Sequence, residues 1–264
     1  MMVSPKNLEA STSTVPNITI PATPLITAAL AYVRELSNSF TYNHVVRCML
    51  FALHIGARHP AAFPSFDAEL VALASILHDL GWETLSENAS TTAAEQKPPN
   101  PLISGDKRFE VDGANAARAF VLKHAPSAAQ DAWPTSRLQL LWDAIALHTS
   151  PSIALHKEPE VRLIALGPFL DFLGPDTPIP LPVTGLQDGE QIVLEREVWD
   201  AVVGKYGREG FRSGVKEMMC HFCRVKPHTT WDNFVEEFGE LFVDGYDRAG
   251  KTIAPLLLGA KEAE

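Results

Sequence analysis

The sequence is poor in cysteine and in basic residues. Its 264 residues include three cysteines, Cys48, Cys220 and Cys223, which cannot all pair within one chain and which therefore suit a reducing compartment. Lysine and arginine total 22 against 32 aspartate and glutamate, a formal charge of -10, and no run of five basic residues occurs. Because sequence-independent nucleic-acid binding needs clustered cations that neutralise phosphates, the composition argues against a nucleic-acid partner.

Long apolar runs are absent as well. No stretch of 18 consecutive apolar residues occurs, and the first residues (MMVSPKNLEASTSTVP) contain neither a basic nor an apolar segment. We therefore expect no membrane association and a cytoplasmic location. Apolar residues make up 46% of the chain and charged residues 20%, which is ordinary globular usage and predicts a folded chain with its own core.

Helical patterns dominate the sequence, and alternating strand patterns are almost absent. Residues 1–24 are rich in Ser, Thr and Pro and have few large apolar side chains, which predicts a flexible N-terminal arm. We expect the rest, residues 25–264, to form one all-α domain with additional C-terminal helices. The predicted helical segments, with caps at Asn38 or Ser39 and at Asp67, lie within 26–58, 67–81, 109–124, 136–148, 159–171, 194–205, 209–225, 230–243 and 248–258.

Two segments are predicted to be connections. Residues 86–106 are polar, contain three prolines and predict a surface loop long enough to act as a lid. Residues 174–192 hold four prolines and three glycines and predict a long connection, with a short strand pair left open.

The adjacent pair His78 and Asp79, at the end of an apolar helical segment, is the most informative feature. Burying an imidazole and a carboxylate there is costly unless something pairs with them, and a divalent cation is the natural partner. A His-Asp pair alone arises by chance in many chains, but His44 on an upstream helix and Asp171 on the apolar stripe of a downstream helix strengthen the prediction. Two imidazoles and two carboxylates would neutralise a divalent ion and leave positions for water, as in a catalytic site.

The order His44, His78-Asp79 and Asp171 resembles the H...HD...D motif of the HD-domain superfamily of metal-dependent hydrolases. The resemblance is closest to its cyanamide hydratase-like branch, especially fungal members, and is carried by SFTYNHVVR, ASILHDLGW, RFEVDGANAA, ALHTSPSIALHKEPEVRLIALGPFLDFLGP and KPHTTWDNFVEEFGE, which span most of residues 30–242. It implies an HD-domain helical bundle and His44, His78, Asp79 and Asp171 as metal ligands. It also implies addition of water to a small nitrile-type substrate, as in the conversion of cyanamide to urea.

Two departures bear on the alternatives. Many HD phosphodiesterases carry lysine in HDxGK, whereas this chain has Trp82 in HDLGW, which weakens the alternative of a nucleotide or phosphate-ester phosphohydrolase. Dinuclear HD enzymes have two further histidines before the last aspartate. His148 fits the second of these, but Asp112 replaces the first, so the resemblance favours one metal ion over the two of a di-iron oxygenase. Ligation of a second ion by Asp112 is the alternative. A scaffold that binds metal only for stability is the alternative without activity.

The expected catalytic residues are His148, Asp112 and Asp79. Asp112 is either the N-cap of a helix or a general base or acceptor near the metal. His148 is either a hydrogen-bonded core histidine, a further ligand, or the acid that protonates the substrate nitrogen. Arg47, one turn after His44, is expected to pair with a core carboxylate if it has no catalytic role.

The expected cofactor is one divalent metal ion, with zinc preferred because the chemistry is redox-free and with iron or manganese able to use the same ligands. The expected partner is a small-molecule substrate, and a homo-oligomer is left open. Cys220, His221 and Cys223 with His228 nearby imitate a zinc pattern, but one CxxC inside a helical run favours core cysteines. Among the tryptophans, Trp82 is the one expected to line the pocket.

Overall fold

The computed structural model describes residues 18–82, 102–125 and 132–258. Within these ranges the chain forms eleven α-helices, one short 3-10 helix and no strand, which confirms the all-α prediction. The helices are α1 (Pro24–Leu36), α2 (Ser39–Arg58), α3 (Ala68–Leu77), α4 (Phe109–His124), α5 (Thr135–Ala146), α6 (Pro151–Ala154), α7 (Pro159–Leu173), α8 (Arg196–Lys205), α9 (Phe211–Val225), η2 (Pro227–Thr229), α10 (Val235–Phe242) and α11 (Ile253–Leu258).

Side-chain caps fix the starts of the first three helices. Thr23, Asn38 and Asp67 each accept a hydrogen bond from the backbone amide three residues ahead, at 3.3, 3.0 and 3.0 Å. Each cap satisfies an amide that has no partner inside its helix. The predicted caps at Asn38 and Asp67 are therefore confirmed.

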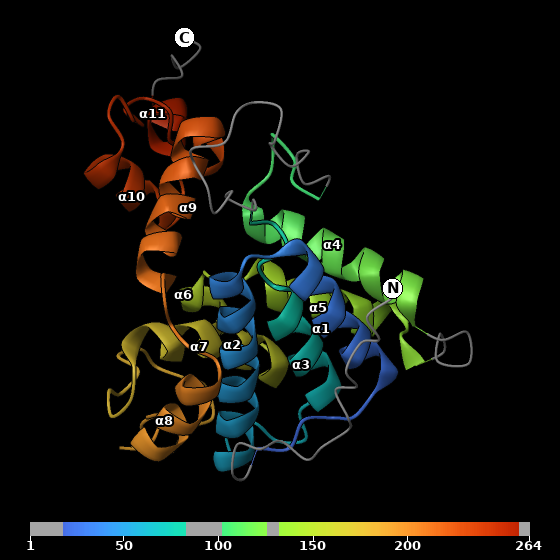
Figure 1. The fold of residues 1–264 in the computed structure, drawn as a ribbon. Helices are drawn as coiled ribbons and strands as arrows, with labels where there is room; N and C mark the ends of the chain where they lie inside the picture. Colours follow the sequence, from blue (N-terminus) through green and yellow to red (C-terminus); the bar gives the residue numbers. More distant parts are fainter. Residues whose placement is uncertain (1–17, 83–101, 126–131, 259–264) are drawn as a thin grey trace.

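The core is built around α2, which packs against both α7 and α3, while α5 lies against α7 and α4 lies against α5 (Figure 1). The buried faces are aliphatic and aromatic, and Phe51, Ile55 and Leu73 are wholly or almost wholly inaccessible to solvent. None of the helices in the described ranges is long and apolar enough to cross a bilayer. The polar residues discussed below lie within this apolar layer, so each of them needs a partner there.

A second apolar cluster joins α9 and α10 to the body of the protein. It contains Trp82, Phe109, Phe211, Val215, Met218, Met219, Phe222, Cys223 and Val235. Trp82 and Phe109 belong to the segments around α3 and α4, so α9 is packed directly beside the His78-Asp79 turn. Cys220 and Cys223 are buried free thiols outside the potential metal-binding groups of the described residues, in agreement with the prediction of core cysteines.

The predicted connections are only partly described. Most of the predicted loop 86–106, and residues 1–17 of the predicted arm, lie outside the described residues. Ile18 is buried against the core, so the last part of that arm belongs to the fold. In the connection 174–192, the backbone amides of Asp176 and Ile179 donate to the carbonyls of Leu194 and Ile192 at 3.0 and 2.9 Å, without forming a strand pair.

Two glycines allow the His78-Asp79 turn to lie against α4. A Cβ atom on Gly81 would overlap the carbonyl oxygen of Phe109, and one on Gly113 would lie 2.6 Å from the carbonyl oxygen of His78. Both obstacles are backbone atoms, which cannot rotate away as a side chain can. The absence of these two side chains therefore sets the distance between the turn and α4.

We expect Gly113→Ala to lower the free energy of unfolding by about 1–3 kcal/mol, because the added methyl group forces α4 away from the turn. Gly204→Ala is the matched control. Gly204 also lies in a helix, but a Cβ there meets nothing within 4 Å, so this change is expected to stabilise by up to about 1 kcal/mol. Urea unfolding measures both, and equal effects of the two substitutions would contradict the packing argument.

Candidate metal centre

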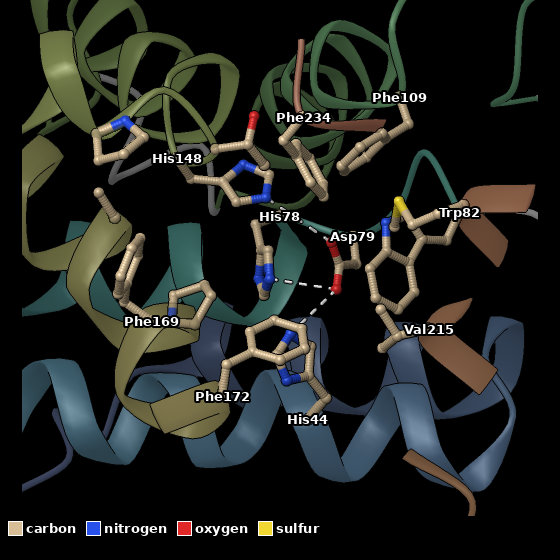
Figure 2. Close-up of a pocket in the computed structure, with 15 residues that line it drawn as sticks. His44, His78, Asp79, Trp82, Phe109, His148, Phe169, Phe172, Val215 and Phe234 are labelled. Atoms are coloured by element: carbon tan, nitrogen blue, oxygen red, sulfur yellow. Dashed lines mark ion pairs between the residues drawn. The ribbon is translucent and has the colours of Figure 1, made fainter. Parts of the chain in front are cut away.

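Three histidines and one aspartate converge inside the helical bundle (Figure 2). His44 comes from α2, His78 and Asp79 from the turn that follows α3, and His148 from the turn that follows α5. None of the four is more than 5% exposed. Their positions in the chain are distant, and the packing of α2, α3 and α5 brings them together.

Asp79 lies at the middle of the group. Its Oδ2 atom is 3.2 Å from Nε2 of His78 and 3.5 Å from Nε2 of His44, and its Oδ1 atom is 4.0 Å from Nε2 of His148. All three imidazoles therefore present the same nitrogen, Nε2, to one carboxylate.

The opposite nitrogen of each ring is held by an oxygen acceptor. Nδ1 of His78 and of His148 donates to the backbone carbonyl three residues upstream, at 2.7 and 2.6 Å. Nδ1 of His44 donates to Oδ2 of Asp171 at 2.7 Å. Because these oxygens only accept hydrogen bonds, Nδ1 carries the proton in each neutral ring and Nε2 carries a lone pair. This is the arrangement that orients histidine as a metal ligand.

The atoms at the centre have no hydrogen-bond partner among the described residues. Nε2 of His78 and both carboxylate oxygens of Asp79 are buried and make no hydrogen bond, although Nε2 of His78 lies 3.2 Å from Oδ2 of Asp79. A buried polar atom left unpaired costs about 1–3 kcal/mol. The ligand atoms of His78, Asp79 and His148 lie within 4.8 Å of one another, so one divalent cation could satisfy all of them. Imidazole and carboxylate ligands suit zinc, iron or manganese.

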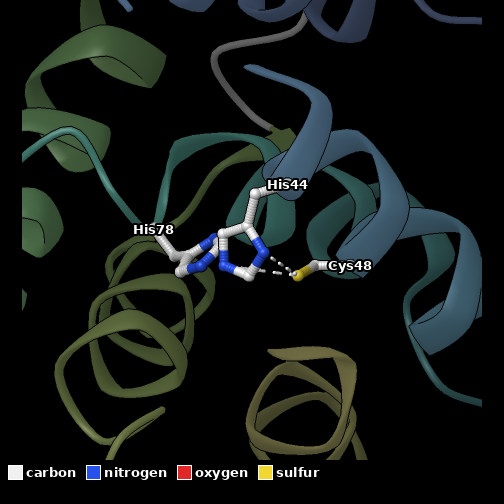
Figure 3. A group of neighbouring side chains, drawn as sticks. All are labelled: His44, Cys48 and His78. Carbon is white, nitrogen blue, oxygen red and sulfur yellow. Dashed lines mark hydrogen bonds between the residues drawn. The ribbon is translucent and has the colours of Figure 1, made fainter. Parts of the chain in front are cut away.

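Cys48 forms a second potential group with His44 and His78 (Figure 3). Its Sγ atom is 3.5 Å from Nδ1 and 3.7 Å from Nε2 of His44, so it is nearly equidistant from the two nitrogens and off the axis of the Nε2 lone pair. Burial raises the pKa of the Cys48 thiol well above its usual value. A neutral thiol is a poor ligand, and Cys48 is better placed to pack against His44 than to share a cation with it.

Asp171 supports His44 from behind. Its carboxylate receives Nε and Nη2 of Arg47 at 2.8 Å each, Nη1 of Arg208 at 2.5 Å and Nδ1 of His44 at 2.7 Å. A carboxylate offers about four lone-pair sites, and these four donors use them. Burial disfavours the charged form, but the hydrogen bonds from His44 and Arg47 outweigh it and hold the pKa of Asp171 at about 2. The predicted ion pair of Arg47 with a core carboxylate is confirmed.

This geometry gives Asp171 the task of orienting His44. Asp171 does not line the cavity beside the other three predicted ligands, and a metal contact would require one of its four donors to give way. Its assignment as a ligand stays a prediction. Arg208, which completes its partners, was not identified from the sequence because it lies in the connection between α8 and α9 and belongs to no motif.

Asp112 lies apart from the converging group. Its Oδ2 atom accepts the backbone amide of Ser104 at 3.0 Å and Nζ of Lys226 at 3.2 Å. It is in the first turn of α4, whose N-cap is Arg108, so the N-cap interpretation is wrong. Lys226 also donates to the carbonyl of Lys107 at 2.8 Å, so the pair ties the start of α4 to the end of α9. The structure does not bring Asp112 to the site, and its catalytic role stays a prediction.

His148 is neutral at neutral pH. Burial is the largest cause and lowers the pKa of His148 to about 4. With Nδ1 bound to a carbonyl, the ring offers only the lone pair of Nε2. It is therefore equipped to bind a metal or to accept a proton, and donating a proton would require that it first receives one.

A cavity of about 330 Å³ opens beside the converging residues (Figure 2). His44, His78, Asp79 and His148 form its polar end together with Trp82 and Thr149, and the rest of the lining is apolar. Phenylalanine is prominent in that lining, at positions 109, 169, 172 and 234. No lysine or arginine lines the described cavity. The expectation that Trp82 lines the pocket is confirmed.

Comparison with known proteins agrees with the geometry. Residues 41–167 match the HD domain family. No curated protein matches the chain. The matched range includes His44, His78, Asp79 and His148 and ends before Asp171. This part of the chain is thus similar to the HD domain, an all-α fold typical of metal-dependent hydrolases.

The converging residues predict a dependence of metal content on Asp79 and His78. We expect the purified protein to hold about one divalent ion per chain, and Asp79→Ala and His78→Ala to hold almost none, because each removes an atom at the centre of the group. His54→Ala is the control, since His54 pairs with Glu195 outside the site. Elemental analysis by mass spectrometry measures all four proteins, and full metal content in Asp79→Ala would contradict the site.

Asp171→Asn separates a supporting role from a direct one. If Asp171 orients His44, the variant should bind the ion about 10–100-fold more weakly but still saturate at the same stoichiometry. Unfolding stability should fall by about 3–5 kcal/mol, because Arg47 is left buried without its carboxylate. Titration with zinc and denaturant unfolding give the two values. Failure to bind any ion at saturating zinc, with the fold intact, would make Asp171 a ligand.

Proposed function

We propose that this HD-domain chain is a metal-dependent hydratase that adds water to the carbon–nitrogen triple bond of a small, neutral, nitrile-type molecule. This is the activity implied by the resemblance to the cyanamide hydratase-like branch. The observation that supports it best is the combination of ligand atoms without hydrogen bonds at Asp79 and His78 with an adjoining cavity whose described lining has no lysine or arginine.

In the proposed enzyme, His44, His78, Asp79 and His148 hold the divalent ion, with Asp171 fixing the ring of His44. Such an ion would lower the pKa of a bound water to about 7 and would polarise the substrate. Hydration forms a double bond between the water oxygen and the substrate carbon. Both π bonds of the carbon–nitrogen triple bond are broken, a carbon–nitrogen single bond remains, and both water hydrogens end on nitrogen. The protein assists by accepting the proton of the attacking water, for which the oxygen of Asp79 that does not bind the ion is the available acceptor.

The size of the cavity favours a substrate larger than cyanamide. Water occupies about 30 Å³ per molecule in the liquid, so the 330 Å³ cavity could hold roughly ten waters, whereas cyanamide has only a few non-hydrogen atoms. The phenylalanine side chains of the lining offer contacts to an apolar group. We therefore propose a nitrile with an aryl or alkyl group as the preferred substrate.

The other candidate activities have less support. An HD domain is equally compatible with phosphate-ester hydrolysis, but phosphate sites use arginine, lysine or helix N-termini, and Trp82 stands where many HD phosphodiesterases have lysine. A di-iron oxygenase needs two ions, and the two potential ligand groups in the described residues share His78. A purely structural metal site would be closed, whereas this one adjoins a cavity.

A substrate panel tests the proposal. Protein loaded with zinc, iron or manganese should convert benzonitrile to benzamide with a kcat/KM at least about 10-fold above that for cyanamide, because apolar contact over a ring contributes more than 1.4 kcal/mol. Asp79→Ala should reduce turnover to background. The panel also contains benzyl isocyanide and a set of nucleotides. Hydrolysis of the nucleotides is measured by the release of phosphate. Phosphate release without amide formation would contradict the proposed hydratase and identify the activity as phosphoester hydrolysis.

A further inference from the structure

Trp82 carries a hydrogen-bond donor that the described protein does not use. The side chain lines the cavity and is 7% exposed, and its Nε1 atom is buried without a partner. An indole nitrogen is a donor only, and a buried donor left unpaired is destabilising by about 1–3 kcal/mol. Such groups in a cavity are candidates for pairing with a ligand.

The indole is held rigidly in its orientation. Its ring is parallel to that of His44, with centroids 5.9 Å apart and an interplanar angle of 7°, and it meets Phe109 edge-on at 6.2 Å. Its backbone amide donates to the carbonyl of Asp79 at 2.9 Å. Figure 2 shows the nitrogen-bearing edge of Trp82 on the side that faces Asp79. The donor therefore lies at the polar end of the cavity.

The other polar side chains of the described lining act as acceptors. His44, His78 and His148 present the lone pairs of Nε2, and Asp79 presents carboxylate oxygens. The hydroxyl of Thr149 donates its hydrogen to Oε1 of Glu110, which leaves only lone pairs toward the cavity. Trp82 is thus the one side-chain donor offered to a ligand by the described lining.

We propose that Nε1–H of Trp82 donates a hydrogen bond to an acceptor atom at the polar end of the substrate. Trp82 is then a specificity-determining residue that selects neutral molecules combining such an acceptor with an apolar group, and that group packs against Phe169, Phe172 and Phe234. An uncharged donor forms a favourable hydrogen bond with a neutral acceptor, but it does not supply the positive charge that binding of a phosphate requires. The identity of the acceptor, a nitrile nitrogen or the oxygen of the amide product, rests on the proposed function.

Nuclear magnetic resonance of the zinc-loaded full chain tests this directly. A ¹H–¹⁵N correlation spectrum resolves indole signals for the five tryptophans, and Trp82→Phe identifies the signal of Trp82. The probes are benzamide, which has an acceptor, and toluene, which has the ring alone. We expect benzamide to shift the Trp82 indole proton downfield and to slow its exchange with solvent, and toluene to bind without a downfield shift.

Affinity measurements on two variants give a second readout. Trp82→Phe keeps an aromatic ring against His44, so it should bind benzamide roughly 3- to 10-fold more weakly, the loss of one hydrogen bond, and bind toluene as before. Trp199→Phe is the control, because Trp199 stacks on Phe51 away from the cavity lining, and it should leave both affinities unchanged.

Several results would overturn the inference: no benzamide binding, binding without a downfield shift of the Trp82 signal, or an equal loss of benzamide and toluene affinity in Trp82→Phe. These outcomes are separable from the proposed function. A chain that hydrates benzonitrile with unchanged kcat and KM in Trp82→Phe retains its function and loses this inference. A chain that binds benzamide through Trp82 but hydrates no nitrile retains this inference and loses the proposed function.

Discussion

The structure depends most on how the carboxylate of Asp79 is satisfied. Burial of this group in an apolar bundle is unfavourable unless positive charge or donors reach both oxygens, and in the described residues neither oxygen has a hydrogen bond. The surrounding imidazoles approach it with lone pairs, since their protonated nitrogens are bound elsewhere. A divalent cation attracts lone pairs from both kinds of side chain, so it would resolve this arrangement.

The surrounding fold serves the same arrangement. Arg47 is fully buried, and beyond its contacts with Asp171 its Nη1 atom donates to the carbonyl of Gly207 at 2.6 Å. The loop before α9 is thereby fixed to α2, and the carboxylate that orients His44 is fixed with it. On the other side, Gly81 and Gly113 let the turn that carries His78 and Asp79 rest on the backbone of α4. A buried ion-pair network thus positions His44, and a close backbone contact positions His78 and Asp79.

Local sequence determined most of the helices and little of the tertiary network. Asn38 and Asp67 act on amides three residues away, so their capping roles are visible in sequence. The sequence indicates His44, His78 and Asp79 as candidate site residues because polar residues are rare in apolar helical segments. The partners of Asp171 include Arg208, and those of Asp112 include Lys226, which lies 114 residues away in the chain. No periodicity links such positions, since folding of the intervening chain creates the contact. The same is true of the cavity, whose aromatic side chains come from four separate segments.

The proposed chemistry follows from the contrast between the polar end of the cavity, which carries the potential metal ligands, and the apolar side chains of the rest of its described lining. Zinc X-ray absorption spectroscopy on the wild type and on His148→Gln tests the central claim most directly, because it counts imidazole and sulfur ligands. The account predicts about three imidazoles and no sulfur in the wild type, and the loss of one imidazole in the variant. A sulfur ligand, or an imidazole count that His148→Gln leaves unchanged, would contradict it.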